Sequence, residues 1–471
     1  MNFRGILASV AILTAVAGCA PQVTPPQTSA ASANRGTSVL PREVERLVGP
    51  AYEDPALQAY VDRVGQRVVA AAALPGSYRF VVLDQPLANA HAVPGYVFVT
   101  RGLLAILEDE AELAAAFGHE LGHLVQRHAA QRARVRKDML DAAVAAATTS
   151  GSVTVGRSVA SAGLLALRRY SREQELEADR LALTYITKAG YRGSAMEALI
   201  HRLRRQSQLE AQIMGETSDV GDRPSASSTH PAPVERLEAL STLPATSAPG
   251  ESDQKEYFAA INGMSVDDPA NEGFVRGTSF LHPTLRLGFT APAGFFVFNE
   301  NDGVLAAGRD RSLMFFSCTT DQVEGRLDDW MRNKLKPTPT DIQATEIGGA
   351  EAAIGARPRG SDTGLAQVRY VIVRHGERIC YFNLMSEGPG QDRQIEVLLN
   401  AARSFHTLSD AEVAALKPYR LRIVSPAGST AAQLAARMPY QTLRMERLLV
   451  LNAAETPADL ARRSEIKLIE P

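Results

Sequence analysis

Two histidines and a glutamate stand together in the middle of the chain, in the order His119-Glu120-Leu121-Gly122-His123. Residues four apart lie on one face of an α-helix, so His119 and His123 can bind one metal ion through their rings. Zinc takes neutral imidazole ligands and, in catalytic sites, keeps one coordination position open for water. A neighbouring carboxylate can then take a proton from water that attacks a carbonyl group. The pattern predicts one zinc ion (Zn2+) per chain and Glu120 as the catalytic residue.

The stretch around these residues predicts a helix, because Ala, Leu and Glu dominate it and no proline interrupts it. Two glycines, Gly118 and Gly122, lie inside it. Each costs about 1 kcal/mol relative to alanine in a helix. We therefore expect another helix, the one that carries the next ligand, to approach the backbone closely there.

A second acidic stretch begins at Ser171, which can cap a helix that Gly190 ends. Glu175 and Asp179 are four apart and share a face, whereas Glu177 points away. Two histidines and a glutamate are a known catalytic zinc set, so we expect Glu175 to be the third ligand. Asp179 is expected to orient a ligand histidine through its other ring nitrogen. Spacing alone leaves open the alternative of an acidic face in solvent.

Composition describes a globular protein of several domains. The chain has 471 residues, of which 45% are hydrophobic and 22% are charged. This length predicts about two to four domains. The net charge of −2 gives no electrostatic argument for nucleic-acid binding.

The N-terminal residues are typical of a processing segment. An apolar run from Ile6 to Ala17 is too short to span a bilayer comfortably, and small residues precede Cys19. This ending resembles a bacterial lipoprotein signal, which implies removal of residues 1–18, lipidation of Cys19 and a flexible tether at 19–40. In a Gram-negative host, the absence of Asp at Ala20 indicates the outer membrane. An ordinary secretory signal is the alternative.

Changes in composition divide the rest of the chain. We expect a mainly helical domain at 41–245, a linker at 246–276, an α+β domain at 277–410 and a small unit at 418–471. The basic and Ala-rich residues 132–158 predict either a helix pair or a lid.

Two further features each leave two interpretations open. The strand predicted at Tyr96–Thr100 precedes the metal-binding helix, and it can either hold an extended peptide by strand pairing or belong to an ordinary hairpin. Cys318 and Cys380 lie in apolar, strand-like runs, where a disulfide and two buried thiols are both compatible with the sequence.

Together these stretches resemble the family-48 zinc metallopeptidases, the group of HtpX, the CAAX prenyl proteases and BepA-like periplasmic lipoproteins. The resemblance rests on four segments in order: NAHAVPGYVFVTRGLL at 89–104, HELGH at 119–123, SR at 171–172 and ELEAD at 175–179. It implies a zincin-type metallopeptidase fold and assigns the ligand roles to His119, His123 and Glu175 and the catalytic role to Glu120. One departure is that only Gly95 stands where a Gly-Gly pair is expected.

The same resemblance singles out Ser228-Thr229-His230-Pro231. In BepA-like members a loop of this kind lies over the active site. The resemblance implies that His230 can take the fourth zinc position and act as a gate that keeps the enzyme resting. A surface loop that caps the next helix is the alternative.

The C-terminal segments carry weaker resemblances. Residues 289–295 and 403–405 look similar to PsbP-like domains, which implies a docking or scaffold role for 277–410. Residues 418–471 resemble a LysM module of βααβ form that closes with the strand Ile466–Leu468, which implies peptidoglycan binding. Gly428-Ser429-Thr430 replaces the usual Gly-Asp-Thr turn of such modules.

The sequence thus predicts a zinc-dependent metalloendopeptidase of the bacterial cell envelope, lipid-anchored on the periplasmic face of the outer membrane. The family resemblance implies misfolded or unassembled envelope proteins as substrates. Two alternatives from other classes are a non-proteolytic periplasmic assembly factor or chaperone, and a peptidoglycan-binding lipoprotein.

Overall fold

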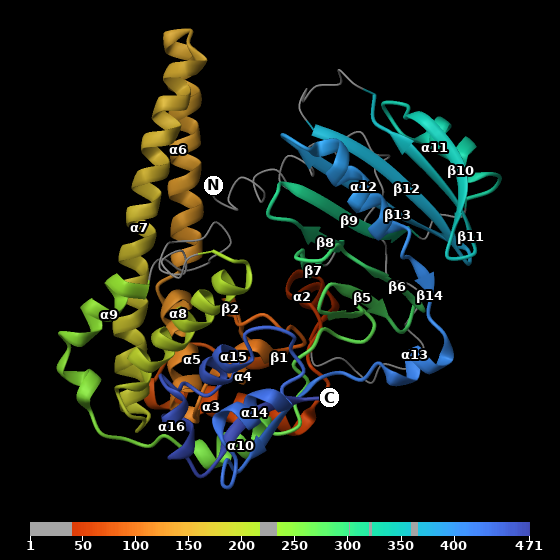
Figure 1. The fold of residues 1–471 in the computed structure, drawn as a ribbon. Helices are drawn as coiled ribbons and strands as arrows, with labels where there is room; N and C mark the ends of the chain where they lie inside the picture. Colours follow the sequence, from red (N-terminus) through yellow and green to blue (C-terminus); the bar gives the residue numbers. More distant parts are fainter. Residues whose placement is uncertain (1–39, 217–232, 301, 320–322, 359–365) are drawn as a thin grey trace. The chain divides into compact units, whose positions relative to one another are not determined.

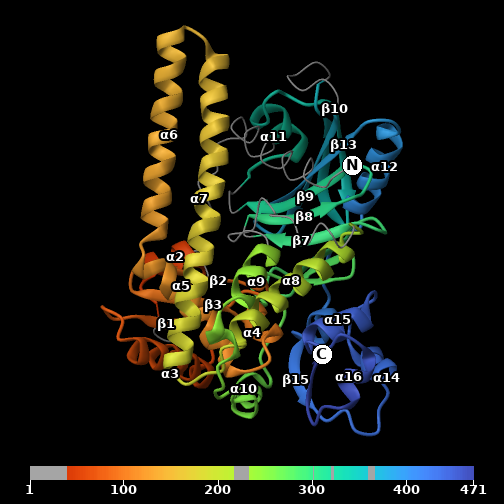
Figure 2. The same cartoon turned by 90° about the vertical axis from the view of Figure 1, so that its left-hand side faces the viewer.

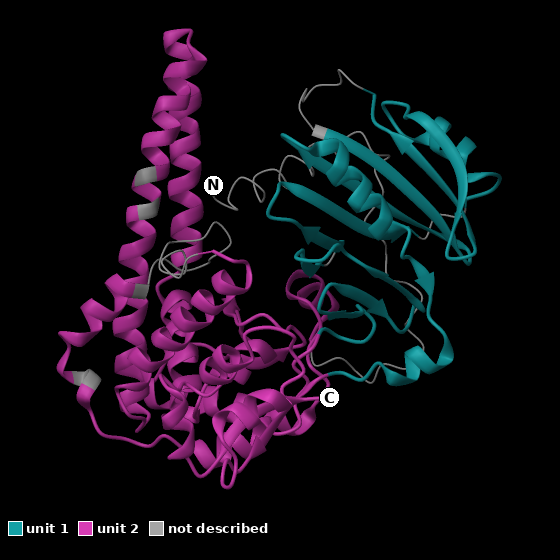
Figure 3. Cartoon of the chain, in the orientation of Figure 1, with its two compact units in different colours: residues 1–37, 268–418 teal, residues 38–267, 419–471 magenta. Residues whose placement is uncertain are grey.

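The computed structural model describes residues 40–216, 233–300, 302–319, 323–358 and 366–471 (Figure 1). They form two compact units, one containing 268–418 and the other containing 40–267 and 419–471 (Figure 3). The chain of the first unit is therefore inserted into that of the second. The composition of the chain predicts consecutive domains instead.

The discontinuous unit is mainly helical. Its elements are α2 (Arg42–Val48), α3 (Pro55–Ala72), β1 (Arg79–Leu83), β2 (Ala90–Val93), β3 (Tyr96–Thr100), α4 (Arg101–Ile106), α5 (Glu110–Val125), α6 (His128–Ser150), α7 (Val153–Lys188), α8 (Ala195–Ile213), α9 (Pro233–Ser241), the 3-10 helix η3 (Pro244–Ser247), α10 (Gln254–Ile261), β15 (Arg420–Val424), α14 (Ala431–Arg437), α15 (Arg444–Leu451), α16 (Pro457–Ala461) and β16 (Ile466–Glu470).

A three-stranded sheet of order β1-β3-β2 precedes the central helix α5. Strand β3 pairs in parallel with β1 and antiparallel with β2, so both of its edges are occupied. The strand predicted at Tyr96–Thr100 is confirmed as β3, but it cannot accept a peptide. Within the described residues β2 has only β3 beside it, so β2 is the edge strand.

Helices α6 and α7 run side by side as an antiparallel pair (Figures 1 and 2). Of the two interpretations of 132–158, the structure has the helix pair. The helices approach closely because small residues face one another: a Cβ placed on Gly156 would lie 2.7 Å from Cβ of Ala147. The predicted helix start at Ser171 is wrong, because α7 already begins at Val153 and no proline interrupts it. Gly190, with φ of +86°, follows the helix end as predicted.

The stretch 246–276, expected to be a linker, differs from that expectation because it contains α10. Tyr257, Phe258 and Ile261 of this helix are buried in the same hydrophobic core as α5. Tyr257 also donates a hydrogen bond of 2.6 Å to the carbonyl oxygen of Leu104.

The C-terminal residues share that core. Strand β15 pairs antiparallel with β16, and three short helices lie between them, one more than the expected βααβ order. Lys467 of β16 is fully buried, and its ammonium donates hydrogen bonds of 3.0 and 2.6 Å to the carbonyl oxygens of Ala105 and Leu107. It also pairs at 2.9 Å with Glu108, directly before α5. The C-terminal segment is thus part of the unit that carries the HELGH helix.

The inserted unit is an α+β structure. Its elements are β4 (Phe274–Arg276), β5 (Ser279–His282), β6 (Leu287–Thr290), β7 (Phe296–Glu300), β8 (Gly303–Ala307), β9 (Ser312–Thr319), α11 (Leu327–Lys334), β10 (Thr340–Ile347), β11 (Ala350–Ala356), β12 (Ala366–His375), β13 (Arg378–Glu387), α12 (Gln391–Ala402), β14 (His406–Thr407) and α13 (Asp410–Ala415).

These strands form a seven-stranded sheet, β10-β11-β12-β13-β9-β8-β7, and a four-stranded sheet, β14-β6-β5-β4. Cys318 and Cys380 are direct partners in the β9–β13 ladder and form a disulfide with an S–S distance of 2.08 Å. Of the two interpretations for these cysteines, the structure has the disulfide.

No helix among the described residues combines the length and the apolar character that a membrane crossing requires.

Candidate metal site

Three side chains from two helices converge in the discontinuous unit. The Nε2 atoms of His119 and His123 on α5 lie 3.1 Å apart. On α7, the Glu175 carboxylate lies 3.4 Å from each, through Oε2 to His119 and through Oε1 to His123. Glu175 is 1% exposed, so this meeting point lies inside the protein.

Helix α5 begins with a conventional cap, because the Asp109 carboxylate accepts a hydrogen bond of 2.9 Å from the backbone N–H of Glu112. The two histidines then lie one turn apart. A Cβ on Gly118 would lie 3.1 Å from Cα of Ala182, and one on Gly122 would lie 3.2 Å from Cα of Ala178. The predicted close approach of a second helix at the two glycines is confirmed, and this helix carries Glu175.

His119 is oriented by a carboxylate on α7. Its Nδ1 lies 2.8 Å from Oδ1 of Asp179, and the Arg236 guanidinium of α9 binds the same carboxylate with two hydrogen bonds of 2.7 Å. Burial alone would raise the pKa of Asp179, but the charge of Arg236 and hydrogen bonds from Arg236 and His119 hold that pKa well below its ordinary value. Burial alone would lower the pKa of His119, but its hydrogen bonds to Asp179 and Glu175 outweigh it and raise that pKa to about 9 in the metal-free protein.

His123 is oriented by a different group. Its Nδ1 lies 2.8 Å from Nδ1 of His128, the first residue of α6. His128 is fully buried, and its Nε2 lies 3.4 Å from Oε2 of Glu177 on α7. Burial, the largest effect for each ring, lowers the pKa of His123 and of His128.

These residues fit a zinc ion. The three ligand atoms all lie within 4.8 Å of one another. Ligands at about 2.0–2.2 Å from zinc stand roughly 3.3–3.6 Å apart when the geometry is tetrahedral, close to the spacings found here. Each histidine turns Nε2 toward the shared point and Nδ1 toward a partner, as ligand histidines do. Glu120, directly after His119, is 5% exposed.

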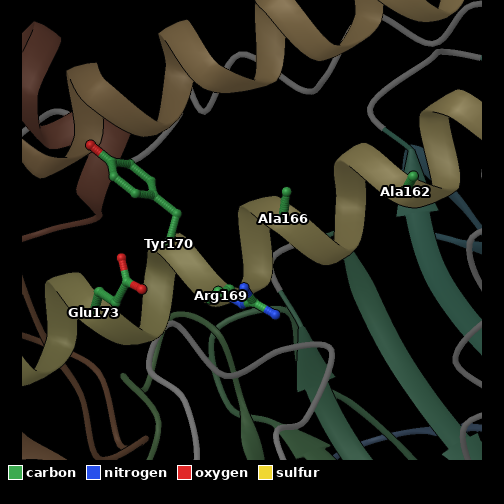
Figure 4. Close-up of a pocket in the computed structure, with 5 residues that line it drawn as sticks. All are labelled: Ala162, Ala166, Arg169, Tyr170 and Glu173. Carbon is green, nitrogen blue, oxygen red and sulfur yellow. The ribbon is translucent and has the colours of Figure 1, made fainter.

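Two predicted site residues, Cys19 and His230, lie outside the described residues. Their roles stay predictions. A separate hollow of about 390 Å³ runs along α7 (Figure 4) and is lined by Ala162, Ala166, Arg169, Tyr170 and Glu173. Its lining contains none of the three candidate ligands.

Comparison with known families assigns this region. A family model described as peptidase family M48 matches residues 55–243. The chain carries an M48 domain. This domain extends from the start of α3 to the residues just after α9, and it contains every residue of the candidate metal site. M48 is a metallopeptidase family, in agreement with the resemblance found in the sequence.

Two curated relatives match the same part of the chain to a modest degree. A putative beta-barrel assembly-enhancing protease of Vibrio cholerae is 29% identical over 201 residues, which are 40% of this chain and 39% of that protein. Mitochondrial metalloendopeptidase OMA1 of Schizosaccharomyces pombe is 30% identical over 194 residues, 41% of this chain and 53% of that protein. The chain therefore spans only 39% to 53% of the length of these relatives.

One solved structure matches a part of the chain weakly. The solution structure of cyanobacterial PsbP from Synechocystis sp. PCC 6803 is 14% identical, covers 28% of this chain and 94% of its own, and has a TM-score of 0.24. At this level the PsbP-like assignment of 277–410 stays a prediction, as does the LysM-like assignment of 418–471.

The roles of two residues of the site, Arg236 and His128, were not predicted from the sequence. Arg236 lies shortly after His230-Pro231. Its ion pair with Asp179 could not be predicted from the spacing of residues. His128 ends the same HELGH-containing stretch, five residues after His123. A third histidine at that distance was the available signal. Glu177, which was expected to point away from the face of Glu175 and Asp179, lies beside His128.

Proposed function

We propose that this protein is a zinc-dependent metalloendopeptidase in which His119, His123 and Glu175 hold the metal ion. The observation that carries the proposal is the convergence of two Nε2 atoms and one carboxylate inside an M48 domain, at mutual distances of 3.1 and 3.4 Å. Zinc held there would supply Lewis-acid polarisation of a substrate carbonyl.

The chain's own residues supply proton transfer and positioning. Glu120 takes a proton from the attacking water and returns it to the leaving amine, as a general base and then a general acid. Asp179 fixes the ring of His119, and Arg236 keeps Asp179 charged. Strand β2, which pairs on one edge only within the part of the chain that the structure describes, offers backbone groups to an extended substrate.

We further propose that the enzyme acts in the cell envelope on misfolded or unassembled envelope proteins. Two things support this. The first 19 residues resemble a lipoprotein signal. The Vibrio cholerae relative is named for enhancing β-barrel assembly. Lipid anchorage at Cys19, the outer membrane as its location and a gating role for His230 belong to the same proposal.

The decisive experiment uses mature protein that lacks the lipid. Bound zinc per chain and cleavage of an unfolded test protein would be measured for the wild type and for Glu120→Gln. We expect one zinc in both proteins and a cleavage rate about 10²–10⁴ times lower in the variant, since the general base is lost.

The possible results separate the claims. Zinc in both proteins without cleavage in either would contradict the peptidase and leave a metal-binding protein, unless His230→Ala restored cleavage. Wild type without zinc would overturn the metal site itself.

A further inference from the structure

We propose that His128, supported by Glu177, is a positioning residue that holds the ring of His123 for metal binding. The inference rests on the proposed function and extends it to a residue outside the HELGH segment. It assigns to His123 the kind of support that Asp179 gives to His119.

The contacts define a chain of three side chains. Nδ1 of His123 faces Nδ1 of His128 at 2.8 Å, and Nε2 of His128 faces the Glu177 carboxylate at 3.4 Å. His128 is fully buried, whereas the Glu177 side chain is 45% exposed. The inner contact is therefore fixed by packing, and the outer contact is reachable by water.

Metal binding determines the direction of both hydrogen bonds. If Nε2 of His123 offers its lone pair to the metal ion, the ring proton of His123 sits on Nδ1. That N–H needs an acceptor, so Nδ1 of His128 must be unprotonated. The proton of the neutral His128 ring then sits on Nε2 and is donated to Glu177. The observed contacts, Nδ1 to Nδ1 between the two rings and Nε2 of His128 to the Glu177 carboxylate, agree with both hydrogen bonds.

A tight turn brings His128 to this place. Helix α5 ends at Val125, and Arg127 adopts a left-handed conformation with φ of +55° before α6 starts at His128. Gly122 of α5 faces Ala178 and Met139 of α6 faces Gly163, so α5 and α6 follow one another along α7. The short break between them places the first ring of α6 against the last turn of α5. A non-glycine residue in this conformation is uncommon, and the turn is held by the helices on both sides.

The simpler explanation is a buried histidine that only satisfies its own hydrogen bonds. The two explanations differ in what they predict for metal affinity. Loss of a merely structural histidine would lower the stability of the metal-free protein but leave the affinity of the folded protein for zinc unchanged. Loss of a positioning residue lowers the affinity itself.

The experiment measures zinc affinity by competition with a chelator, on full-length mature protein, together with thermal melting of each metal-free variant. The variants are His128→Ala, His128→Asn and Glu177→Ala. The amide oxygen of Asn can occupy the place of Nδ1 and accept the hydrogen bond from His123. His201→Ala, which removes an exposed histidine of α8, is the matched control.

We expect His128→Ala to weaken zinc binding about 10–100-fold, the usual loss when the partner of a ligand histidine is removed. His128→Asn should recover most of that affinity. Glu177→Ala should cost a few-fold in the wild-type background and nothing in the His128→Asn background, because Asn makes no use of Glu177. His201→Ala should bind zinc as the wild type does.

Wild-type affinity in a folded His128→Ala variant would overturn the proposal. If that variant does not fold, the effect of Glu177→Ala on zinc affinity is compared between the wild-type and the His128→Asn backgrounds. An equal loss of affinity in both backgrounds overturns the proposal. A wild type that binds zinc but cleaves nothing contradicts the proposed function alone. A wild type without zinc contradicts both.

Discussion

Asp179 lies between a cation and a histidine, and each neighbour makes a different demand on it. Arg236 requires a charged carboxylate, because both groups are almost completely buried. His119 requires an acceptor for its Nδ1 proton. One charged carboxylate meets both demands, and the site then depends on the ion pair that stabilises it.

Replacing Arg236 with Met should lower the free energy of unfolding by about 3–5 kcal/mol, because the buried Asp179 carboxylate loses the charge of the guanidinium and both of its hydrogen bonds. Urea denaturation of the metal-free protein measures this. Arg172→Met is the control. This substitution removes an ion pair of 3.9 Å between Arg172 and Glu235, whose side chains are 47% and 59% exposed. It should change the free energy of unfolding by less than about 1 kcal/mol. A similar loss in both variants would contradict the argument.

Asp179 also predicts a dependence on pH. Its pKa in the folded protein is lowered, so its contribution to stability is present above the unfolded pKa of about 3.9 and is lost as pH falls toward the folded pKa. As the pH falls from about 5 to 3, the free energy of unfolding of the metal-free wild type should decrease by up to about 1.4 kcal/mol per pH unit more than that of Asp179→Asn. His119, with its pKa raised to about 9, is protonated in both states over this range.

Urea denaturation of both proteins at several pH values from 3 to 6 gives the two slopes. Equal slopes would mean that Asp179 is not a charged, stabilised group in the folded protein.

The sequence could predict which residues share a helix face, because spacing alone decides that. His119 with His123, and Glu175 with Asp179, follow from it. Partners from distant segments could not be predicted. Arg236 lies 57 positions after Asp179, and Glu177 lies 49 after His128, and only the packing of three helices brings them together.

At the scale of elements, the site depends on how closely α5 and α7 pack. The two glycines of α5 face Ala178 and Ala182 on α7, and the three candidate ligands stand on the same two helices. Any change in the separation of the helices changes the distance between the two histidines and Glu175.

Gly122→Val should therefore weaken zinc binding by about tenfold or more, because the added side chain meets the backbone of Ala178 and moves Glu175 away. Chelator competition measures the affinity. Ala142→Val, at an exposed position of α6, adds similar bulk without such a contact and should bind zinc as the wild type does. Unchanged affinity in Gly122→Val would show that the site tolerates a wider separation.

The sequence placed Glu175 and Asp179 on one face of a helix but did not predict the length of α7. Residues 153–170 contain four β-branched residues and two glycines, Gly156 and Gly163, which have weak intrinsic helix preference. Contact with α6 decides the outcome: both glycines lie against α6, at Ala147 and Met139. Tertiary packing of this kind is not visible in a local pattern.

At the scale of the whole molecule, one unit is inserted into the other. The entry and exit strands of the chain run beside each other. The N–H of Gly263 bonds the carbonyl of Leu421 at 2.8 Å, and the N–H of Val266 bonds that of Tyr419 at 2.9 Å. The sequence could not show this, because it pairs segments more than 150 residues apart.

Replacing residues 268–418 with a short Gly-Ser linker should therefore leave a folded, zinc-binding protein, since the two ends already meet. A chain that stops at Pro418 should not fold, because it lacks Leu421, Ile466 and Leu468 of the core that contains α5. Melting temperature and zinc per chain distinguish the two. A stable, zinc-binding chain ending at Pro418 would show that the C-terminal segment is a separate module.

A metal ion held by both α5 and α7 would act on the chain as a reversible cross-link. It would join His123 to Glu175 and close a loop that contains α6 and the first part of α7. The entropy of closing such a loop grows slowly with its length, by about 0.6 kcal/mol for each doubling. Insertions or deletions at the turn around Gly151 would therefore change the closure entropy little. The helix pair lies between His123 and Glu175 in the sequence. Its length is therefore free to vary during evolution without a change in the metal site.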